Sequence, residues 1–148
     1  MADIADQIAQ ARAGRHPRLV GQVRSGWVVM GERQFLPGYC LLLADPVVPT
    51  VNDLTQTQRS RFLLDLTLIG DALLQQTPAL RTNYEILCNV VQELHAHVFP
   101  RFADEDAALA GKSAFFYDWE QAPRWSEAEH GALRRQLQQT LEQLQAQH

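Results

Sequence analysis

ELHAHVFPR, residues 93–101, alternates polar and apolar side chains over its first six positions. Successive side chains of a β-strand point to opposite faces, so a strand here would separate the two kinds. Four side chains are predicted to share one face: Glu93, His95, His97 and Phe99. The other face is apolar and is predicted to pack into the core: Leu94, Ala96, Val98 and Pro100.

Two imidazoles and a carboxylate on one strand face allow three interpretations. The first is a solvated face with incidental histidines. The second is a metal site at Glu93, His95 and His97, because two histidines and a carboxylate bind metal in non-haem iron and some zinc sites. The third is attack of a neutral imidazole on phosphorus, which needs an acceptor for the second ring nitrogen and donors around the phosphate. Nearby polar side chains could supply such donors: Asn89, Gln92 and Arg101.

Around this stretch, the sequence predicts three helices and four further strands. Apolar residues at helical spacing indicate helices at about 2–13, 54–76 and 126–146. Short apolar or alternating runs bounded by turn residues indicate strands at 18–23, 26–31, 39–44, 83–90 and 94–101. No strand–helix–strand unit repeats along the chain. The predicted fold class is therefore α+β, with an antiparallel sheet of about five strands, a long central helix and a C-terminal helix.

Capping residues and turn composition mark where the predicted elements begin and end. Asn52 or Asp53 is predicted to cap the central helix, and Ser126 with Glu129 forms a candidate capping box for the last one. Residues 102–113 are predicted to form a polar loop. The aromatic segment 114–125 is predicted to be irregular and pinned to the sheet by its tryptophans.

Length and composition restrict the class of protein. A chain of 148 residues fits one domain, 1–148. With 46% hydrophobic and 20% charged residues and a net charge of −4, neither a nucleic-acid polymer nor an anionic membrane is an expected partner. No apolar run reaches the roughly 20 residues of a membrane span. The N-terminus also lacks the basic start of a signal peptide, so a cytoplasmic location is expected. Cys40 and Cys88 are far apart and are expected to be buried free thiols.

Residues 93–101 and the elements before them together resemble a known family. LHAHVFPR is similar to the end of the signature of the histidine-triad (HIT) superfamily of nucleotide hydrolases and transferases, His-x-His-x-His followed by Pro-Arg. Upstream, residues 27–46 (WVVMGERQFLPGYCLLLADP) resemble the family's strand–loop–strand, and residues 53–74 its central helix. Residues 83–89 (NYEILCN) resemble the strand before the signature. The resemblance covers about residues 20–102 and leaves a C-terminal extension beyond it.

The resemblance implies a function for both histidines. His95, at the middle position, would attack the α-phosphorus of a nucleotide and form a covalent nucleotidyl-histidine that water then hydrolyses. His97, at the third position, would hydrogen-bond the phosphoryl oxygens. The backbone carbonyl of residue 93 would accept a hydrogen bond from the nucleophile. Further substrate-binding side chains are implied or suggested by position: Asn89, Gln92, Glu93, Tyr39, Trp27, Phe35 and Arg101.

The implied substrate is a small nucleotide with a phosphoanhydride or phosphoramidate bond, such as a dinucleoside polyphosphate or an adenosine phosphoramidate. No cofactor is required by such chemistry, and a homodimer with a continuous sheet is expected from the family.

The sequence departs from the family pattern at three positions. Glu93 stands where the first triad histidine is expected, and Tyr39 where many members have another histidine. Because those two positions lie close together in the family fold, Glu93 and Tyr39 are predicted to form a hydrogen-bonded pair. Cys88 stands where a glycine is common. The alternative functions are a non-catalytic nucleotide-binding or sensing module and the metal site described above.

Overall fold

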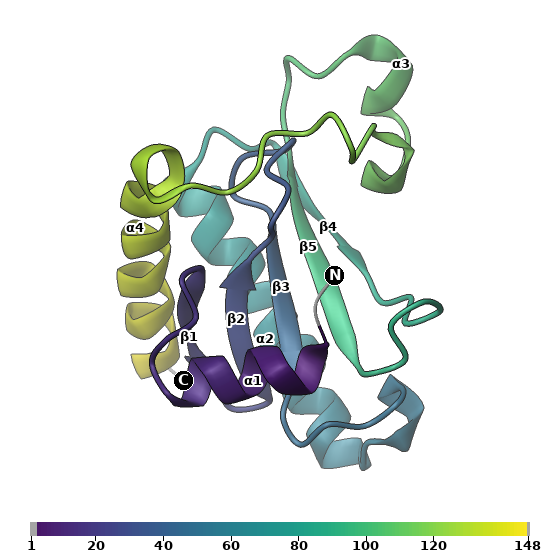
Figure 1. Cartoon of the computed structure of the whole chain (residues 1–148), viewed down its shortest axis with the longest axis vertical. Helices are drawn as coiled ribbons and strands as arrows, with labels where there is room; N and C mark the ends of the chain where they lie inside the picture. The colour runs from purple at the N-terminus through teal and green to yellow at the C-terminus, as the bar shows by residue number, and fades with distance from the viewer. Residues whose placement is uncertain (1–2, 148) are drawn as a thin grey trace.

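A five-stranded antiparallel sheet forms the centre of the molecule, in a computed structural model that describes residues 3–147 (Figure 1). Its strands are β1 (Leu19–Val23), β2 (Gly26–Met30), β3 (Cys40–Ala44), β4 (Arg81–Glu85) and β5 (His95–Arg101). Their order in the sheet is β1-β2-β3-β5-β4, and every neighbouring pair is antiparallel. The strand that carries both histidines therefore lies between β3 and β4. The predicted α+β class is confirmed.

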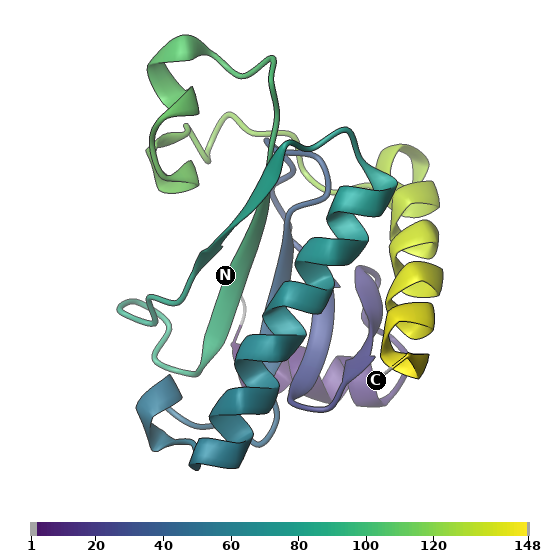
Figure 2. The ribbon, with the colours of Figure 1, turned by 180° about the vertical axis from the view of Figure 1, so that it is seen from behind.

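The long helices cover one face of the sheet, and the first helix lies on the other. α2 (Gln56–Gln76) and α4 (Glu127–Ala146) pack side by side on the face that is turned towards the viewer in Figure 2. α1 (Ile4–Arg12) crosses the front of the sheet, as Figure 1 shows. Three short helical turns complete the described chain: η1 (Val51–Asp53), α3 (Ala107–Ala110) and η2 (Ala114–Phe116). Within residues 3–147, no helix has the length and apolarity required to cross a membrane.

The predicted alternation along β5 is confirmed by two separate hydrophobic clusters. Leu94, Ala96 and Val98 join the cluster between the sheet and the helices α2 and α4. Phe99 belongs to the cluster on the opposite face, where Ile4 and Ile8 of α1 are also buried. Since every residue of β5 is buried, both faces of this strand are covered.

The caps of the long helices differ in part from the prediction. α2 begins after Thr55, whose hydroxyl accepts from the Gln58 N–H, while the Gln58 side chain accepts from the Thr55 N–H. Asp53 instead accepts from the main chain and hydroxyl of Thr50 at η1. Ser126 caps α4 as predicted, but its own N–H donates to His130 rather than completing a box with Glu129. The cap predicted at Asp53, two residues before Thr55, therefore belongs to the separate turn η1 and not to α2.

Two segments that flank β5 differ from the prediction. The strand predicted at 83–90 ends at Glu85, so residues 86–94 form a loop that leads into β5. In this loop Cys88 has a φ of 55°, a conformation that favours glycine, so the backbone itself accounts for a glycine preference at this position. The polar segment predicted as a loop at 102–113 contains α3, which Asp106 caps through the Ala108 N–H.

Candidate active site

His95 is the first residue of β5 and its imidazole is almost wholly buried, at 4% exposure. Its Nδ1 lies 2.7 Å from the carbonyl oxygen of Glu93. A carbonyl can only accept, so Nδ1 carries the proton and Nε2 carries the free lone pair. The structure thus has the orienting contact that the resemblance implied, and its acceptor is the main-chain oxygen of residue 93.

His97, two residues along the same strand, is held by Tyr39. The Tyr39 hydroxyl lies 2.7 Å from His97 Nδ1, and both side chains are buried. Burial raises the pKa of Tyr39 above its ordinary range, whereas burial and then the charge of His95 lower the pKa of His97 to about 3. At neutral pH the phenol is therefore protonated and the imidazole neutral. We assign the hydroxyl as the donor to the Nδ1 lone pair, and in this tautomer the proton of His97 is on Nε2.

The two histidines consequently present complementary atoms. Their rings meet edge to face with centroids 5.1 Å apart. His95 offers a lone pair on Nε2, and His97 offers an N–H donor on Nε2. A nucleophile beside a neutral hydrogen-bond donor is the pairing that attack on a phosphoryl group requires.

An aromatic cover from the C-terminal part of the chain lies over His97. The Phe115 ring stands edge-on to His97 with centroids 4.9 Å apart, and it stacks on Trp119 at 5.0 Å. Phe99 stacks against the His97 ring at 5.7 Å. Because His95 and His97 are only 4% and 6% exposed, the interpretation of a solvated strand face is wrong.

A cavity of about 380 Å³ opens beside the histidines. His95, His97 and Asn89 line it, and the remaining wall is mainly apolar, with Val90 and Phe115 among its exposed residues. None of the described residues that line it is a lysine or an arginine. The cavity suits a compact phosphoryl group attached to an uncharged substituent.

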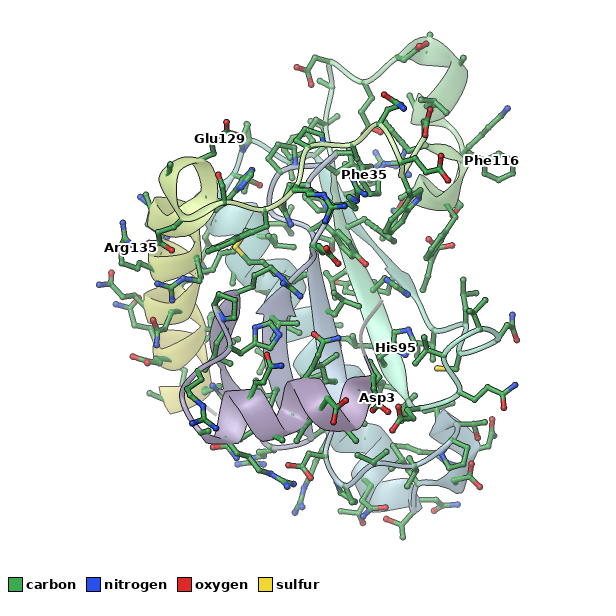
Figure 3. All side chains as sticks on the ribbon, in the orientation of Figure 1. Asp3, Phe35, His95, Phe116, Glu129 and Arg135 are labelled. Atoms are coloured by element: carbon green, nitrogen blue, oxygen red, sulfur yellow. The ribbon has the colours of Figure 1, made fainter. Side chains whose placement is uncertain are left out.

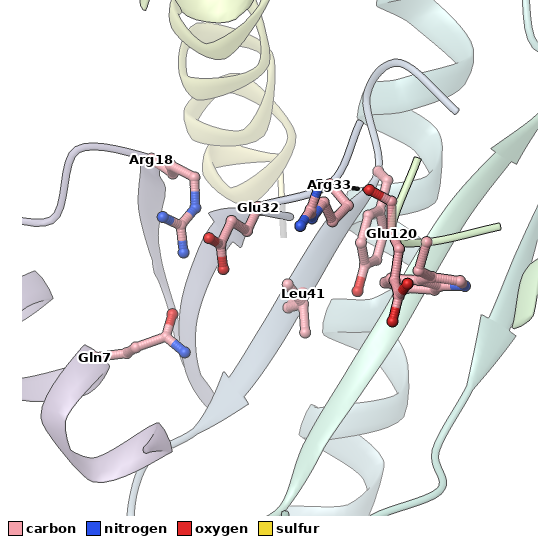
Figure 4. A pocket seen from close by; sticks show the side chains of 8 residues that line it. Gln7, Arg18, Glu32, Arg33, Leu41 and Glu120 are labelled. Carbon is pink, nitrogen blue, oxygen red and sulfur yellow. Dashed lines mark hydrogen bonds between the residues drawn. The ribbon is translucent and has the colours of Figure 1, made fainter. Parts of the chain in front are cut away.

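A second cavity of about 300 Å³ lies on the other side of Tyr39 and Trp119, which line both cavities. Figure 4 shows its polar side chains, contributed by α1, the residue before β1, the β2–β3 loop and, through Glu120, the segment after η2. Arg18 donates through Nε to the Met30 carbonyl at 3.0 Å, and Arg33 donates to the carbonyls of Glu120 and Ala122. A polar cavity therefore lies next to the histidine cavity, with the rings of Tyr39 and Trp119 between them.

Glu93 and Tyr39 take different partners from the predicted pair. Tyr39 bonds to His97, whereas Glu93 Oε1 accepts the backbone N–H of Ile4 at 3.2 Å. Burial, and then the neighbouring Asp3 side chain, raise the pKa of Glu93 above its ordinary value. Figure 3 shows Asp3 at the start of α1 beside the strand that carries His95. The carboxylate of Glu93 is thus used at the helix end and does not line the histidine cavity.

Arg101 also lies away from the cavity. Its Nη2 and Nε contact Glu105 at 2.8 and 3.1 Å, and its Nη1 donates to Asn83 at 2.9 Å and to the Lys112 carbonyl at 2.6 Å. With 5% exposure, this guanidinium holds the region of α3 to the end of β5. Its partners inside the protein leave it no donor directed at the histidines.

Three other predicted binding residues lie outside the histidine cavity. Trp27 donates through Nε1 to Asp45 at 3.1 Å. Phe35 packs behind Trp119, with ring centroids 4.6 Å apart, so it supports the aromatic cover rather than forming the wall itself. Gln92 is exposed in the loop before β5. Of the polar side chains predicted around the phosphate, Asn89 alone joins the histidines and Tyr39 at the cavity.

The sequence interpretation missed Phe115 as a cavity residue and, for Trp119, favoured pinning of the segment to the sheet over lining the pocket. Trp119 lines the cavity. The density of aromatic residues in 114–125 was the available signal.

The metal interpretation lacks a set of ligands in the described part of the chain. Across residues 3–147, no three histidine, cysteine, aspartate or glutamate side chains are grouped so that they could hold a metal ion. Glu93 is bonded to α1, and His97 Nδ1 is occupied by Tyr39.

Buried histidines are expected to make the fold sensitive to mild acid. The pKa of His97 is lowered to about 3. The pKa of His16 is lowered to about 4, by burial first and then by the charge of Arg18. In the unfolded chain both imidazoles titrate near 6.5, so below this pH the unfolded state binds protons that the folded state does not bind. The free energy of unfolding should therefore fall as the pH drops from about 6.5 towards 4, by up to ~1.4 kcal/mol per pH unit for each histidine.

Urea unfolding at several pH values between 7 and 4.5 measures this slope. His97→Asn should reduce it by about one proton. An unchanged slope in that variant would show that His97 titrates normally in the folded protein.

Comparison with known proteins supports the reading of the fold. Residues 27–104 match the family model described as HIT domain. Among solved structures, a histidine triad protein from Sinorhizobium meliloti 1021 is 22% identical, with a TM-score of 0.70 and coverage of 88% of this chain and 93% of that one. One from Marinobacter aquaeolei VT8 is 20% identical, with a TM-score of 0.73 and coverage of 85% and 89%.

A Zn-bound histidine triad family protein from Mycobacterium smegmatis is 17% identical, with a TM-score of 0.67 and coverage of 98% of this chain and 95% of that one. At these identities the likeness concerns the fold. No curated protein matches the sequence. Since the family model spans more than half of the chain, the protein belongs to the HIT domain family.

Proposed function

We propose that the protein is a nucleotide hydrolase that cleaves a phosphoanhydride or phosphoramidate bond at the α-phosphate. The observation that carries the proposal is the 2.7 Å contact between His95 Nδ1 and the Glu93 carbonyl, which leaves the Nε2 lone pair free. In the first step Nε2 forms a bond to the α-phosphorus, and the leaving group departs with the bonding electron pair and takes up a proton from solvent. In the second step water attacks phosphorus and gives up a proton to solvent, the P–N bond breaks with its electron pair returning to Nε2, and His95 is regenerated.

His97 would stabilise the charge that develops on the phosphoryl oxygens. Its Nε2–H is directed by the Tyr39 hydrogen bond at Nδ1, so the donor is in place before substrate binds. Asn89, from the loop before β5, supplies an amide donor in the same cavity. This chemistry requires no metal ion.

The charge of the two cavities supports a preference among substrates. A polyphosphate chain carries several negative charges, which proteins usually neutralise with arginine, lysine or a metal ion. The lining at His95 lacks arginine and lysine and is largely apolar. An adenosine phosphoramidate or another nucleoside monophosphate with an uncharged leaving group therefore fits better than a dinucleoside polyphosphate. The second cavity is lined by Arg18 and Arg33, but it lies across Tyr39 and Trp119 from the histidines.

Covalent capture tests the proposal. A nucleoside phosphoramidate labelled at the α-phosphorus, quenched with base during turnover, should leave an acid-labile and base-stable label on the peptide that contains His95. Dinucleoside tri- and tetraphosphates should be turned over more slowly. Binding of nucleotide without labelling and without turnover would instead identify a non-catalytic binding or sensing module.

We also propose that two chains pair through β4, as the family expectation of a homodimer suggested. β4 is an outer strand of the sheet, and Leu80 and Tyr84 beside its open edge are 62% and 39% exposed. An unpaired strand edge with exposed apolar side chains is suited to pairing with a second copy across a two-fold axis. A solution molar mass of two chains would support this arrangement.

A further inference from the structure

Glu93 makes two contacts that join different parts of the molecule. Its side-chain Oε1 accepts the N–H of Ile4, the first residue of α1, 89 positions away in the sequence. Its main-chain carbonyl accepts Nδ1–H of His95. One residue therefore connects the start of α1 to the imidazole with the free Nε2.

The helix end of this connection is well anchored. The first N–H groups of a helix lack partners within the helix, and a carboxylate there satisfies them and interacts favourably with the helix dipole. Asp3 accepts from Ala5 at 2.7 Å, which leaves the N–H of Ile4 for Glu93. Ile4 and Ile8 are at most 1% exposed and pack on the sheet with Leu43. α1 is thus a fixed point for the Glu93 side chain.

The Glu93 carbonyl, just before the start of β5, needs a fixed contact of this kind to keep its direction. Glu93 precedes β5 and follows an irregular loop, so no strand partner holds its own N–H. The Glu93 carbonyl and the Leu94 N–H belong to one planar peptide unit, and this N–H donates to the Val48 carbonyl at 2.7 Å, which holds one edge of the unit. The Glu93 side chain restrains the Cα at the start of the same unit. Rotation of this residue would turn the carbonyl away from His95 Nδ1.

We propose that Glu93 is a positioning residue for His95: by bonding to α1, its side chain fixes the carbonyl that sets the tautomer and direction of the imidazole. The residue that replaces the first triad histidine then acts through the backbone instead of through direct contact with substrate. The link to catalysis rests on the proposed function, but the effect on the ring of His95 does not.

The ring nitrogens of His95 report on this effect in the absence of substrate. In ¹⁵N-labelled protein at pH 7.5, His95 should show one tautomer, with the proton on Nδ1; the signals are assigned by their absence in His95→Ala. In Glu93→Ala the His95 signals should move towards the averaged shifts of two exchanging tautomers. Glu93→Gln, which keeps an oxygen acceptor for Ile4, should retain the single tautomer.

Ser126→Ala is the matched control at another helix end. It removes the side-chain cap of α4, which accepts the Glu129 N–H, and should lower the melting temperature, yet leave the His95 signals in place. If Glu93→Ala shows an unchanged His95 tautomer, or if Ser126→Ala changes it equally, the assignment of this role to Glu93 is overturned.

Turnover gives the second readout. Glu93→Ala should lower kcat about tenfold with little change in KM, and Glu93→Gln should restore most of it, because a misdirected nucleophile slows chemistry more than binding. A wild type without turnover, but with the expected tautomer change in Glu93→Ala, would contradict the proposed hydrolase and leave the positioning role standing.

Discussion

Replacing His95 with alanine will lower nucleotide turnover by about four orders of magnitude or more, because loss of a nucleophile removes the covalent route altogether. His95 and His97 are the imidazoles at the cavity, and the Nδ1 of His97 is engaged by Tyr39, which leaves His97 as a donor. The strand should persist, because β5 pairs with β3 and β4 through the main chain. Steady-state kinetics with a nucleoside phosphoramidate and a circular dichroism melt measure both effects.

His130→Ala is the control for this experiment. His130 is also buried, at 7% exposure, but it lies on α4 and accepts the N–H of Ser126 through Nδ1. That variant should lose stability at the start of α4 and keep its turnover. Wild-type turnover in His95→Ala would refute the covalent mechanism.

Replacing Gly31 with alanine will damage both stability and catalysis. A Cβ at residue 31 would overlap the Cδ2 and Cε2 atoms of the Tyr39 ring. This ring is 2% exposed, stacks on Phe99 at 4.5 Å and bonds to His97, so it cannot move without releasing His97 Nδ1. We expect a loss of ~2–3 kcal/mol of stability from overpacking. We also expect a fall in kcat of about 100-fold, because His97 loses its direction.

Variants of Tyr39 separate the two effects. Tyr39→Phe keeps the ring and removes the hydroxyl, so it should lower kcat about tenfold, less than Gly31→Ala does. In a double-mutant cycle with Tyr39→Ala, the stability losses should be less than additive, because the clash disappears with the ring. Additive losses in urea unfolding would show that the added methyl group acts elsewhere.

Much of the fold could be predicted because local patterns and tertiary packing agree. The alternation in 93–101 placed Ala96 and Val98 in the core and the histidines on the other face, as the two hydrophobic clusters show. Apolar residues at helical spacing predicted α2 and α4 within a few residues of their observed bounds. These signals come from side chains that neighbour one another within a single element.

The site was less predictable, because its contacts join distant segments. Arg101 follows a proline at the end of the signature, where a phosphate donor is plausible, yet Glu105 and Asn83 occupy it. Glu93 meets α1 from 89 positions away, and no periodicity encodes that contact. A glutamate four residues after the arginine was the one local sign of the Arg101 ion pair.

The wall over His97 is built by residues beyond 27–104, the range that matches the family model. In the proposed function, His95 and His97 of the matched range cleave the bond, while Phe115 and Trp119 of the later segment form part of the cavity wall. Mutations in 105–125 can reshape the wall while β5 and its histidines stay intact. Divergence among relatives that share β5 should therefore concentrate in this extension, and exchanging it between them is a direct route to altered selectivity.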